Sequence, residues 1–395
     1  MRPRVAAVLV LVASALSADR SAARTQEPDG AAGLREATTE DIILGQRVRM
    51  QSASFGTERT VLVHLPDGYE GSEDQYPVLM VVGGDYFLPA AGVATYLAGD
   101  SRMPEVIVVA VPIEDWVAEF TYTPTRDTAA FYATAGGADQ LQRFLSDEVI
   151  PYIDATYRVL PLRILVGHSL GGLFAVETMT RYPELFQVTI AISPSLFYND
   201  GDWVERLPAY LQNARSREQV LYLALANETA IPPYMERAVE LLGRHAPRGV
   251  SFAFEHSPKE SHVSVALPAL VQGLRSAFAG WSFGDVEMWT LGAEGIRAHF
   301  DSLRTRLGVD IPLPRNEIIA HGFHAMERHQ EVDAAIEMFL LAVSLDDGSA
   351  DAHAGLAEAY QRKGMREEAV EHCRRRLAID PEHEQARALL AALEG

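Results

Sequence analysis

The chain has 395 residues and a formal net charge of −20, with 34 Lys and Arg residues against 54 Asp and Glu residues. This charge disfavours binding to nucleic acid or to an anionic membrane surface, and it favours solubility. Hydrophobic residues make up 48% of the chain and charged residues 22%, which is typical of a globular protein with a large core. The length predicts two domains, or one large domain with an appendage.

The N-terminus has the pattern of a signal peptide. Arg2 and Arg4 precede an apolar run over residues 5–16, which is too short to span a bilayer comfortably, and small residues follow it. We therefore expect residues 1–23 to be a signal peptide of an exported protein, periplasmic or secreted, with no membrane span after cleavage. An uncleaved anchor is the alternative. Residues 24–39 lack an apolar period and predict a disordered leader.

Strand and helix patterns alternate over residues 40–280. Two segments alternate apolar and polar residues like half-buried strands, and six continuous apolar runs predict strands buried on both faces. The eight segments are 47–52, 60–64, 78–82, 106–111, 164–166, 188–192, 220–226 and 250–254. Helical patterns between them include 138–153 and 233–245. This alternation predicts an α/β fold with a doubly wound, mostly parallel sheet, whose ligands bind beyond the carboxyl ends of the strands.

The run Gly167-His168-Ser169-Leu170-Gly171-Gly172 lies between the strand pattern of residues 163–166 and a helix pattern over 173–182. A Gly-x-Ser-x-Gly sequence at a strand-to-helix turn is typical of the nucleophile elbow of α/β-hydrolases. The strained serine backbone projects its hydroxyl from the sheet, and the glycines let strand and helix approach closely. Ser169 is the predicted nucleophile. The alternative is a glycine-rich turn that only packs the helix on the strand.

A serine nucleophile needs a base and an acid, which follow it in the order acid then histidine in α/β-hydrolases. Glu228 comes directly after a predicted strand and is the predicted acid. Asp200 and Asp202, after the preceding strand, are the alternatives. His262 lies at a loop-to-helix junction after the last strand and is the predicted base, with a helix expected from residue 263 onward. His256 still lies on that strand and is expected to be structural.

Two backbone N–H groups are needed to bind the oxyanion. One is expected from Leu170, directly after the nucleophile, and the other from Asp85 or Tyr86, in the loop after the third strand. Gly83 and Gly84 in that loop free the backbone to point inward, and no Gly-Lys-Ser/Thr follows them as in a phosphate-binding loop. The mechanism predicted here requires no metal and no organic cofactor.

Several motifs resemble, in order and spacing, the esterase family that includes enterochelin (ferric siderophore) esterases. Residues 81–87 resemble that family's Asp-Gly-Asp-x-Phe loop. The other matching segments are 167–172, 182–186, 193–195, 227–228 and 260–264. The resemblance covers about residues 40–280 and implies an α/β-hydrolase that acts on carboxylic esters, with Ser169, His262 and Glu228 as its active groups.

The sequence also departs from this family pattern. Gly83 stands where the family usually has Asp, and residues 116–125 lack the arginines that would suit an anionic siderophore. Trp116, Phe120 and Tyr122 in that segment instead suggest an apolar or aromatic acyl pocket, unless they belong to the core. The candidate substrate-binding residues are Tyr86, Trp116, Phe120 and His168.

After residue 314 the chain is rich in Ala, Glu, Arg, Leu and His and has no strand runs. A period of 34 residues pairs Ala335 with Ala369 and Phe339 with Cys373, which is the spacing of a tetratricopeptide repeat. We expect two such repeats and a closing helix over 384–393, and a protein partner or self-association through this tail. A generic helical hairpin is the alternative.

Two further features of the tail have plain interpretations. Cys373 is the only cysteine, so an internal disulfide is excluded, and its spacing predicts a small buried side chain. His321, His324 and His329 superficially resemble a metal cluster, but no acidic residue accompanies them at ligand spacing. We expect a solvated helix face there.

The predicted organisation is a signal peptide, a leader, a hydrolase domain, a linker containing a helix, and a tetratricopeptide-like tail. Their ranges are 1–23, 24–39, 40–280, 281–314 and 315–395. The predicted function is a serine esterase. An acyltransferase on the same fold and a non-catalytic hydrolase-like domain that presents the repeats are the main alternatives, and a peptidase ranks last.

Overall fold

The computed structural model describes residues 41–125, 132–214, 218–283 and 288–395. The predicted signal peptide and leader lie outside these residues, so both stay predictions. Residues Leu44–Gly395 form one compact unit. Within the described ranges, no helix combines the length and the apolar character that crossing a membrane requires.

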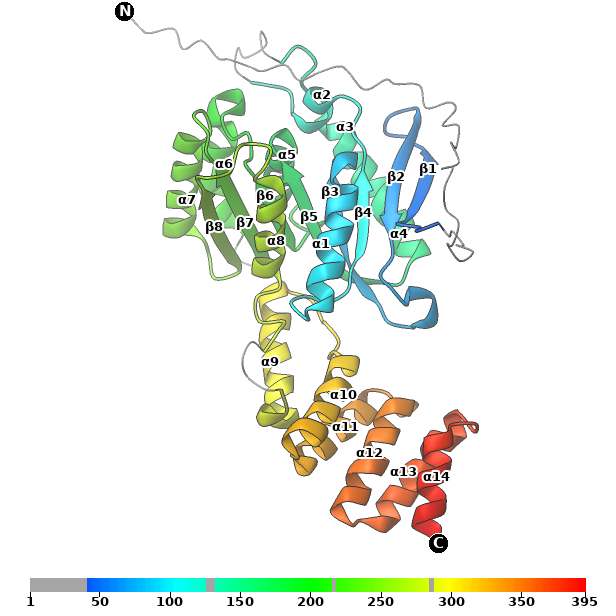
Figure 1. The fold of residues 1–395 in the computed structure, drawn as a ribbon. Helices are drawn as coiled ribbons and strands as arrows, with labels where there is room; N and C mark the ends of the chain where they lie inside the picture. The colour runs from blue at the N-terminus through cyan, green and yellow to red at the C-terminus, as the bar shows by residue number, and fades with distance from the viewer. Residues whose placement is uncertain (1–40, 126–131, 215–217, 284–287) are drawn as a thin grey trace, which may run out of the picture. The chain divides into compact units, whose positions relative to one another are not determined.

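An eight-stranded sheet forms the centre of the first domain (Figure 1). Its strand order is β1-β2-β4-β3-β5-β6-β7-β8, with antiparallel pairing of β1 with β2 and of β2 with β4, and parallel pairing elsewhere. The strands are β1 (Gln46–Gln51), β2 (Glu58–His64), β3 (Tyr76–Val82), β4 (Ile107–Val111), β5 (Val159–His168), β6 (Val188–Ile192), β7 (Gln219–Ala226) and β8 (Val250–Ser257). The predicted mostly parallel, doubly wound sheet is confirmed.

Helices cover both faces of this sheet, as Figure 1 shows. Two helices pack on one face, and their apolar residues share a core with the odd-numbered residues of β3 and the even-numbered residues of β6. They are α1 (Phe87–Gly99) and α8 (Ala266–Ala277). The remaining helices bury their apolar residues against the opposite face. They are α2 (Trp116–Phe120), α3 (Ala138–Arg143), α4 (Ile150–Thr156), α5 (Leu170–Arg181), α6 (Asp202–Asn213) and α7 (Pro232–His245).

The central strands have the composition that burial on both faces requires. Every residue of β3, β6 and β7 is buried, whereas exposed residues alternate along the edge strand β1. Strand β5 is longer than the predicted run because Val159 pairs with Tyr76 of β3, before a register shift that precedes Val78. Pro161 is exposed within this early part of β5, and the polar and exposed positions there hide the strand from a search for apolar runs.

The helix expected over residues 138–153 is present but irregular. A π-helical turn over Phe144–Val149 joins α3 to α4. Pro151 lies in the first turn of α4. Proline has no backbone N–H and its ring crowds the carbonyl four residues earlier, so a regular α-helical hydrogen bond is impossible there. The wider π turn accommodates this residue without ending the helix.

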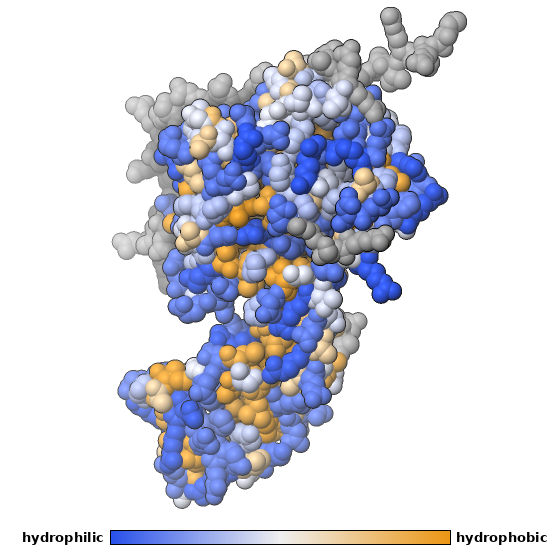
Figure 2. All heavy atoms as spheres, turned by 180° about the vertical axis from the view of Figure 1, so that it is seen from behind, coloured by the Kyte–Doolittle hydropathy of each residue, from blue (hydrophilic) through white to orange (hydrophobic). Residues whose placement is uncertain are grey.

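All the secondary structure of the C-terminal region is helical where it is described. Its elements are α9 (Gly292–Leu307), α10 (Arg315–His324) with a π turn to His329, α11 (Val332–Leu345), α12 (Ala350–Lys363), α13 (Arg366–Ile379) and α14 (Glu384–Glu394). Ala335 and Phe339 in α11, and Ala369 and Cys373 in α13, are all fully buried. The period of 34 residues therefore places equivalent residues in equivalent core positions. Figure 2 shows apolar residues gathered on this region as well as on the sheet domain.

The apolar core continues from the sheet domain into the tail. Ile296 and Phe300 of α9 are fully buried and belong to one apolar cluster with residues of β5, β6 and α11. The guanidinium of Arg306 donates hydrogen bonds to the carbonyl oxygens of Ala277 and Ala279, at 2.9 and 2.7 Å. Helix α9 thus anchors the tail on the end of α8. The predicted domain boundaries at residues 280 and 314 stay predictions.

Phe339 is the residue around which the first repeat is packed. Its ring lies so close to α10 and α12 that a Cβ atom at Gly322 would lie 2.7 Å from the ring, and one at Gly355 would lie 2.5 Å from it. Real Cβ atoms do not approach other atoms this closely. Glycine at these two positions allows the three helices to share one aromatic side chain.

We predict opposite effects for the same substitution at two helical glycines. Gly355→Ala should lower the free energy of unfolding by about 1–3 kcal/mol, because its new methyl group overlaps Phe339. Gly92→Ala in α1 meets nothing within 4 Å and should raise that free energy by about 0.5–1 kcal/mol, the ordinary gain in a helix. Urea denaturation of both variants is the measurement. Equal shifts at the two sites would contradict the packing described for the tail.

Candidate active site

The loops that carry the predicted active groups leave the sheet at one edge. They follow the carboxyl ends of β3, β5, β6, β7 and β8, and these strands run parallel in neighbouring positions. Two of these loops are joined directly, because the N–H of Asn227 after β7 donates to the carbonyl oxygen of Glu260 after β8, at 2.9 Å. This edge is where an α/β sheet positions a ligand.

Ser169 has a strained backbone at the junction of β5 and α5. Its φ is 59° and its ψ is −121°, values that an L-residue avoids unless the surrounding structure imposes them. A Cβ atom at Gly167 would lie 2.0 Å from the carbonyl oxygen of Gly171, and one at Gly172 would lie 3.0 Å from Pro194. The glycines are therefore required by close backbone contacts. Helix α5 begins at Leu170, three residues earlier than expected, directly after the serine.

The structure brings Ser169, His262 and Glu228 together in one line of hydrogen bonds. Ser169 Oγ lies 2.9 Å from His262 Nε2, and His262 Nδ1 is hydrogen-bonded to Glu228 Oε1. The Glu228 side chain is only 9% exposed, whereas that of His262 is 39% exposed. A buried carboxylate that accepts from Nδ1–H fixes the ring tautomer that leaves Nε2 free to accept a proton.

The alternative acids and the second histidine belong to other elements of the fold. The carboxylate of Asp202 forms an ion pair with Arg206 at 2.8 Å. Asp200 lies in a turn with a φ of 56°. His256 is an exposed residue of β8, in register with Leu225 of β7.

The helix expected from residue 263 begins at Ala266 instead. The later start of this helix has a local cause. Mutual hydrogen bonds between Ser261 and Ser264 hold a turn directly after the histidine-bearing loop.

The two loops expected to supply oxyanion donors adopt suitable conformations. Leu170 is the first residue of α5, where a backbone N–H has no partner within the helix. Asp85 lies in the first turn of a short 3₁₀ helix over Gly84–Tyr86. The N–H of Tyr86 donates to the carbonyl oxygen of Gly83 at 3.2 Å. Of the two expected alternatives, Asp85 is therefore the better placed donor.

Gly83 has a physical reason to replace the Asp that the family usually has at this position. Its φ of 122° strongly favours glycine. A Cβ atom there would lie 3.2 Å from the ring of Tyr86 and 3.5 Å from the ring of Trp116. The loop after β3 is thus packed beneath two aromatic side chains.

The aromatic residues of the 116–125 segment divide into two groups. Trp116 is 38% exposed and contacts Phe120 edge-on, with 5.5 Å between ring centroids. Phe120 is fully buried and lies close to Gly171, and Tyr122 is also buried, with Arg181 over its ring. Burial favours the core interpretation for Phe120 and Tyr122, and it leaves Trp116 as the one of the three that is open to solvent.

His168 and Tyr86, two of the predicted substrate-binding residues, are hydrogen-bonded to each other. Tyr86 Oη lies 2.6 Å from His168 Nδ1, and His168 Nε2 lies 2.7 Å from the carbonyl oxygen of His262. Burial and the neighbouring His262 lower the pKa of His168 to about 4, and burial raises the pKa of Tyr86 to about 12. Both side chains are therefore neutral at neutral pH.

Ser195 lies beside Ser169, the predicted nucleophile, and the sequence patterns assigned it no role at the site. Its Oγ lies 3.4 Å from Ser169 Oγ, and its N–H donates to the carbonyl oxygen of Ser169 at 3.1 Å. The Ser-Pro-Ser sequence after β6 was a usable signal, because β6 pairs directly with β5. Its position shows that the loop after β6 supports the strained turn.

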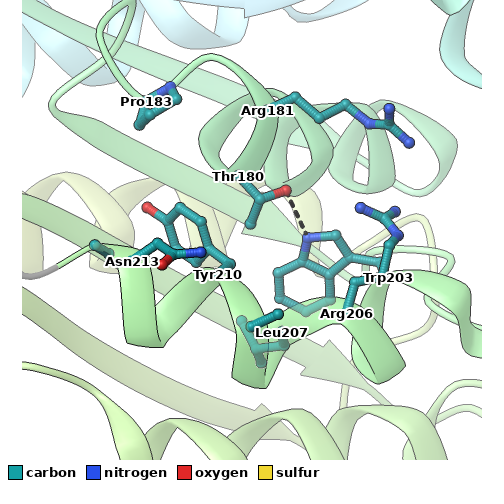
Figure 3. A pocket seen from close by; sticks show the side chains of 10 residues that line it. Thr180, Arg181, Pro183, Trp203, Arg206, Leu207, Tyr210 and Asn213 are labelled. Atoms are coloured by element: carbon teal, nitrogen blue, oxygen red, sulfur yellow. Dashed lines mark hydrogen bonds between the residues drawn. The ribbon is translucent and has the colours of Figure 1, made fainter.

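A cavity of about 420 Å³ between α5 and α6 is separate from this site (Figure 3). Thr180 and Trp203 line it, with a hydrogen bond of 3.3 Å from the indole N–H to the hydroxyl. Thr180 lies three turns along α5 from Ser169, about 16 Å at the rise of an α-helix. The guanidinium of Arg206 in this cavity is engaged by Glu177 at 2.5 Å. The cavity is therefore too far from Ser169 to bind a substrate of the predicted nucleophile.

The tail histidines surround an aromatic ring. The ring centroids of His321, His324 and His329 lie 6.0, 5.3 and 5.0 Å from that of Trp289. The expected solvated face is thus partly an aromatic cluster. Across the residues that the structure places, no group of three or more His, Cys, Asp or Glu side chains is arranged to hold a metal ion. Cys373 is buried, as expected, and burial raises the pKa of its thiol.

Family models match both the predicted hydrolase region and the predicted repeat region of the chain. Residues 52–228 match the family model described as "Putative esterase", and residues 328–393 match that of the tetratricopeptide repeat. The resemblance predicted from the motifs is therefore confirmed. The esterase match ends at Glu228, so the placement of His262 rests on the geometry described above.

Ferri-bacillibactin esterase BesA from Bacillus subtilis (strain 168) is 28% identical over 156 residues, which are 38% of this chain and 54% of that protein. Siderophore triacetylfusarinine C esterase from Aspergillus fumigatus is 30% identical over 150 residues, 35% and 51% of the two chains. The matches thus span about half the length of these curated relatives.

Solved structures share the fold. An IroE-like serine hydrolase from Shewanella oneidensis superposes with a TM-score of 0.69 at 23% identity, covering 76% of this chain and 99% of that chain. The BES protein from Bacillus cereus has a TM-score of 0.54 at 25% identity, covering 61% and 98%. The sheet and its helices therefore form the α/β-hydrolase fold that the motifs predicted.

The lowered pKa of His168 predicts a specific dependence of stability on pH. Between pH 6.5 and 4 the unfolded chain binds a proton at this position and the folded chain does not. The free energy of unfolding should therefore fall as pH drops through this window, by on the order of 3 kcal/mol from this group. Urea denaturation of His168→Gln at pH 7 and pH 4.5 should show a smaller loss than the wild type. His256→Gln is the control for an exposed histidine, and an unchanged loss in His168→Gln would contradict the assignment.

Proposed function

We propose that the chain is a serine hydrolase of carboxylic esters. The observation that carries this proposal is the hydrogen-bonded line from Ser169 Oγ through His262 to Glu228, at a serine whose φ is 59°. A strained serine next to an unprotonated ring nitrogen is the arrangement that generates an oxygen nucleophile. The esterase-family match over residues 52–228 supports the ester as the bond attacked.

The proposed reaction has two halves. Ser169 Oγ attacks the ester carbonyl carbon while His262 Nε2 takes the hydroxyl proton, and the same nitrogen then gives this proton to the leaving alcohol. Water repeats the sequence on the acyl-enzyme, with His262 as base, and releases the carboxylic acid. Glu228 holds the ring and stabilises its cation during both halves. The N–H groups of Leu170 and Asp85 stabilise the oxyanion of each tetrahedral intermediate.

The substrate class is inferred from the names of the relatives and from the segment beside the oxyanion loop. The two curated relatives described above are named as esterases of siderophores. The segment over residues 116–125 contains no arginine, and it presents the half-exposed Trp116 beside Gly83 of the oxyanion loop. An aromatic wall of this kind suits an apolar or aromatic acyl group. We infer esters with apolar or aromatic acyl groups, and a panel of aryl, feruloyl, acyl-sugar and siderophore esters tests this.

Ser169→Ala should fold normally and lose about three or more decades of kcat on the best ester of that panel, because it removes the nucleophile. Initial rates of the purified variant and the wild type, with circular dichroism of both, give the comparison. Near-wild-type turnover by the variant would overturn the proposal. Added acceptor alcohols in the same assay distinguish hydrolysis from acyl transfer.

Glu228→Gln separates the proposed acid from Asp202, one of the two alternatives. The amide cannot stabilise the histidine cation, so we expect a loss of about 10²–10⁴ in kcat, clearly smaller than that of His262→Ala. Asp202→Asn is the matched control, because Asp202 pairs with Arg206 rather than with the histidine. A silent Glu228→Gln together with a crippled Asp202→Asn would assign the role to the other loop.

A further inference from the structure

We propose that Tyr86, His168 and the backbone carbonyl of His262 form a clamp that fixes the predicted oxyanion loop, residues 83–86, against the base. In this role Tyr86 and His168 are positioning residues and not substrate contacts. The inference rests on the proposed function, and it deepens it by assigning two side chains that the Ser169–His262–Glu228 line leaves out.

The clamp connects three segments that are distant in sequence. Tyr86 ends the 3₁₀ turn after β3, and its Oη lies 2.6 Å from His168 Nδ1 at the end of β5. On the other side of the same ring, Nε2 lies 2.7 Å from the carbonyl oxygen of His262, in the loop after β8. The rings of His168 and His262 are also in contact, with 4.6 Å between their centroids and an angle of 40° between their planes.

The chemistry of these groups fixes the direction of both hydrogen bonds. A carbonyl oxygen only accepts, so His168 Nε2 carries the proton and donates to His262. In a neutral imidazole the other nitrogen then accepts, so the hydroxyl of Tyr86 donates to Nδ1. The low pKa of His168, about 4, is consistent with this neutral ring. The chain of donors therefore runs in one direction from the oxyanion loop to the base.

This arrangement leaves neither ring nitrogen of His168 available to a substrate. The residue is only 7% exposed, and both of its nitrogen atoms are used within the clamp. The hydroxyl of Tyr86 is committed to the same ring. The expectation that these two residues bind substrate is therefore replaced by a role in which they hold other groups in place.

The places where the clamp is attached explain its consequence for the reaction. Tyr86 follows Asp85, the proposed oxyanion donor, and His168 precedes Ser169, the proposed nucleophile. The third end is the backbone of the base itself. Fixing donor, nucleophile and base relative to one another acts on the transition state, and a displacement of about 1 Å in such a site costs up to 10²-fold in rate. Substrate affinity depends much less on this alignment.

The experiment compares kcat and KM of single variants of the full chain on a soluble aryl ester. The concentration of active sites is taken from the initial burst of released alcohol, and rates are divided by it. Tyr86→Phe removes only the donor hydroxyl, and His168→Gln keeps a donor for the carbonyl of His262 that His168→Ala lacks. Tyr69→Phe is the matched control, because it deletes another buried tyrosine hydroxyl, one that accepts from the N–H of Arg158 at 2.9 Å. A trifluoromethyl ketone serves as the tetrahedral analogue.

We expect kcat to fall about 10- to 100-fold in Tyr86→Phe and His168→Ala, with KM within about twofold of the wild type. The ketone should bind more weakly by a similar factor. His168→Gln should recover part of the loss, and Tyr69→Phe should keep the wild-type kcat.

Four outcomes would overturn the clamp. A raised KM with unchanged kcat would return these residues to substrate contact. A lowered melting temperature with unchanged kcat and unchanged ketone binding would leave them a purely structural role. If Ser169→Ala is inactive while both clamp variants turn over normally, only the clamp fails. If Ser169→Ala is as active as the wild type, the proposed function fails and the clamp fails with it.

Discussion

The positive φ of Ser169 is the constraint around which the rest of the site is arranged. An L-residue keeps this conformation only if neighbouring segments enforce it, and here the backbone of Gly167 lies almost in contact with that of Gly171. The N–H of Ser169 donates to Ile192 of β6 at 2.9 Å, and its carbonyl oxygen accepts from Ser195 at 3.1 Å. The elbow is therefore held from both sides by the sheet and by the next loop.

The parallel sheet brings Glu228 and His262 to the same edge as Ser169. Because β5, β6, β7 and β8 are consecutive neighbours, the chain returns to the same edge after each crossover helix. Each return places one short loop beside the serine. The backbone hydrogen bond from Asn227 to Glu260 holds the loop that carries Glu228 against the loop that carries His262, so these two side chains meet although 34 residues separate them.

The sequence carried much of this arrangement in its apolar runs and loop residues. The predicted strand over 188–192 is identical to β6. The order of Ser169, Glu228 and His262 along the chain was enough to predict that these three residues meet. Local side-chain chemistry was harder to foresee. The π turn at Phe144 depends on a proline seven residues later, and the burial of Phe120 depends on Gly171, which is distant in sequence. The partners of His168 come from two other loops, so its motif alone suggested substrate contact.

The most direct test of the account is to locate the nucleophile chemically. A fluorophosphonate reacts with an activated serine and leaves a stable adduct, which peptide mass spectrometry assigns to one residue. We predict one adduct per chain, on Ser169, with His262→Ala abolishing the reaction because the base that activates the hydroxyl is gone. An adduct on another serine would contradict the mechanism. So would a protein that hydrolyses esters but is not labelled by the probe.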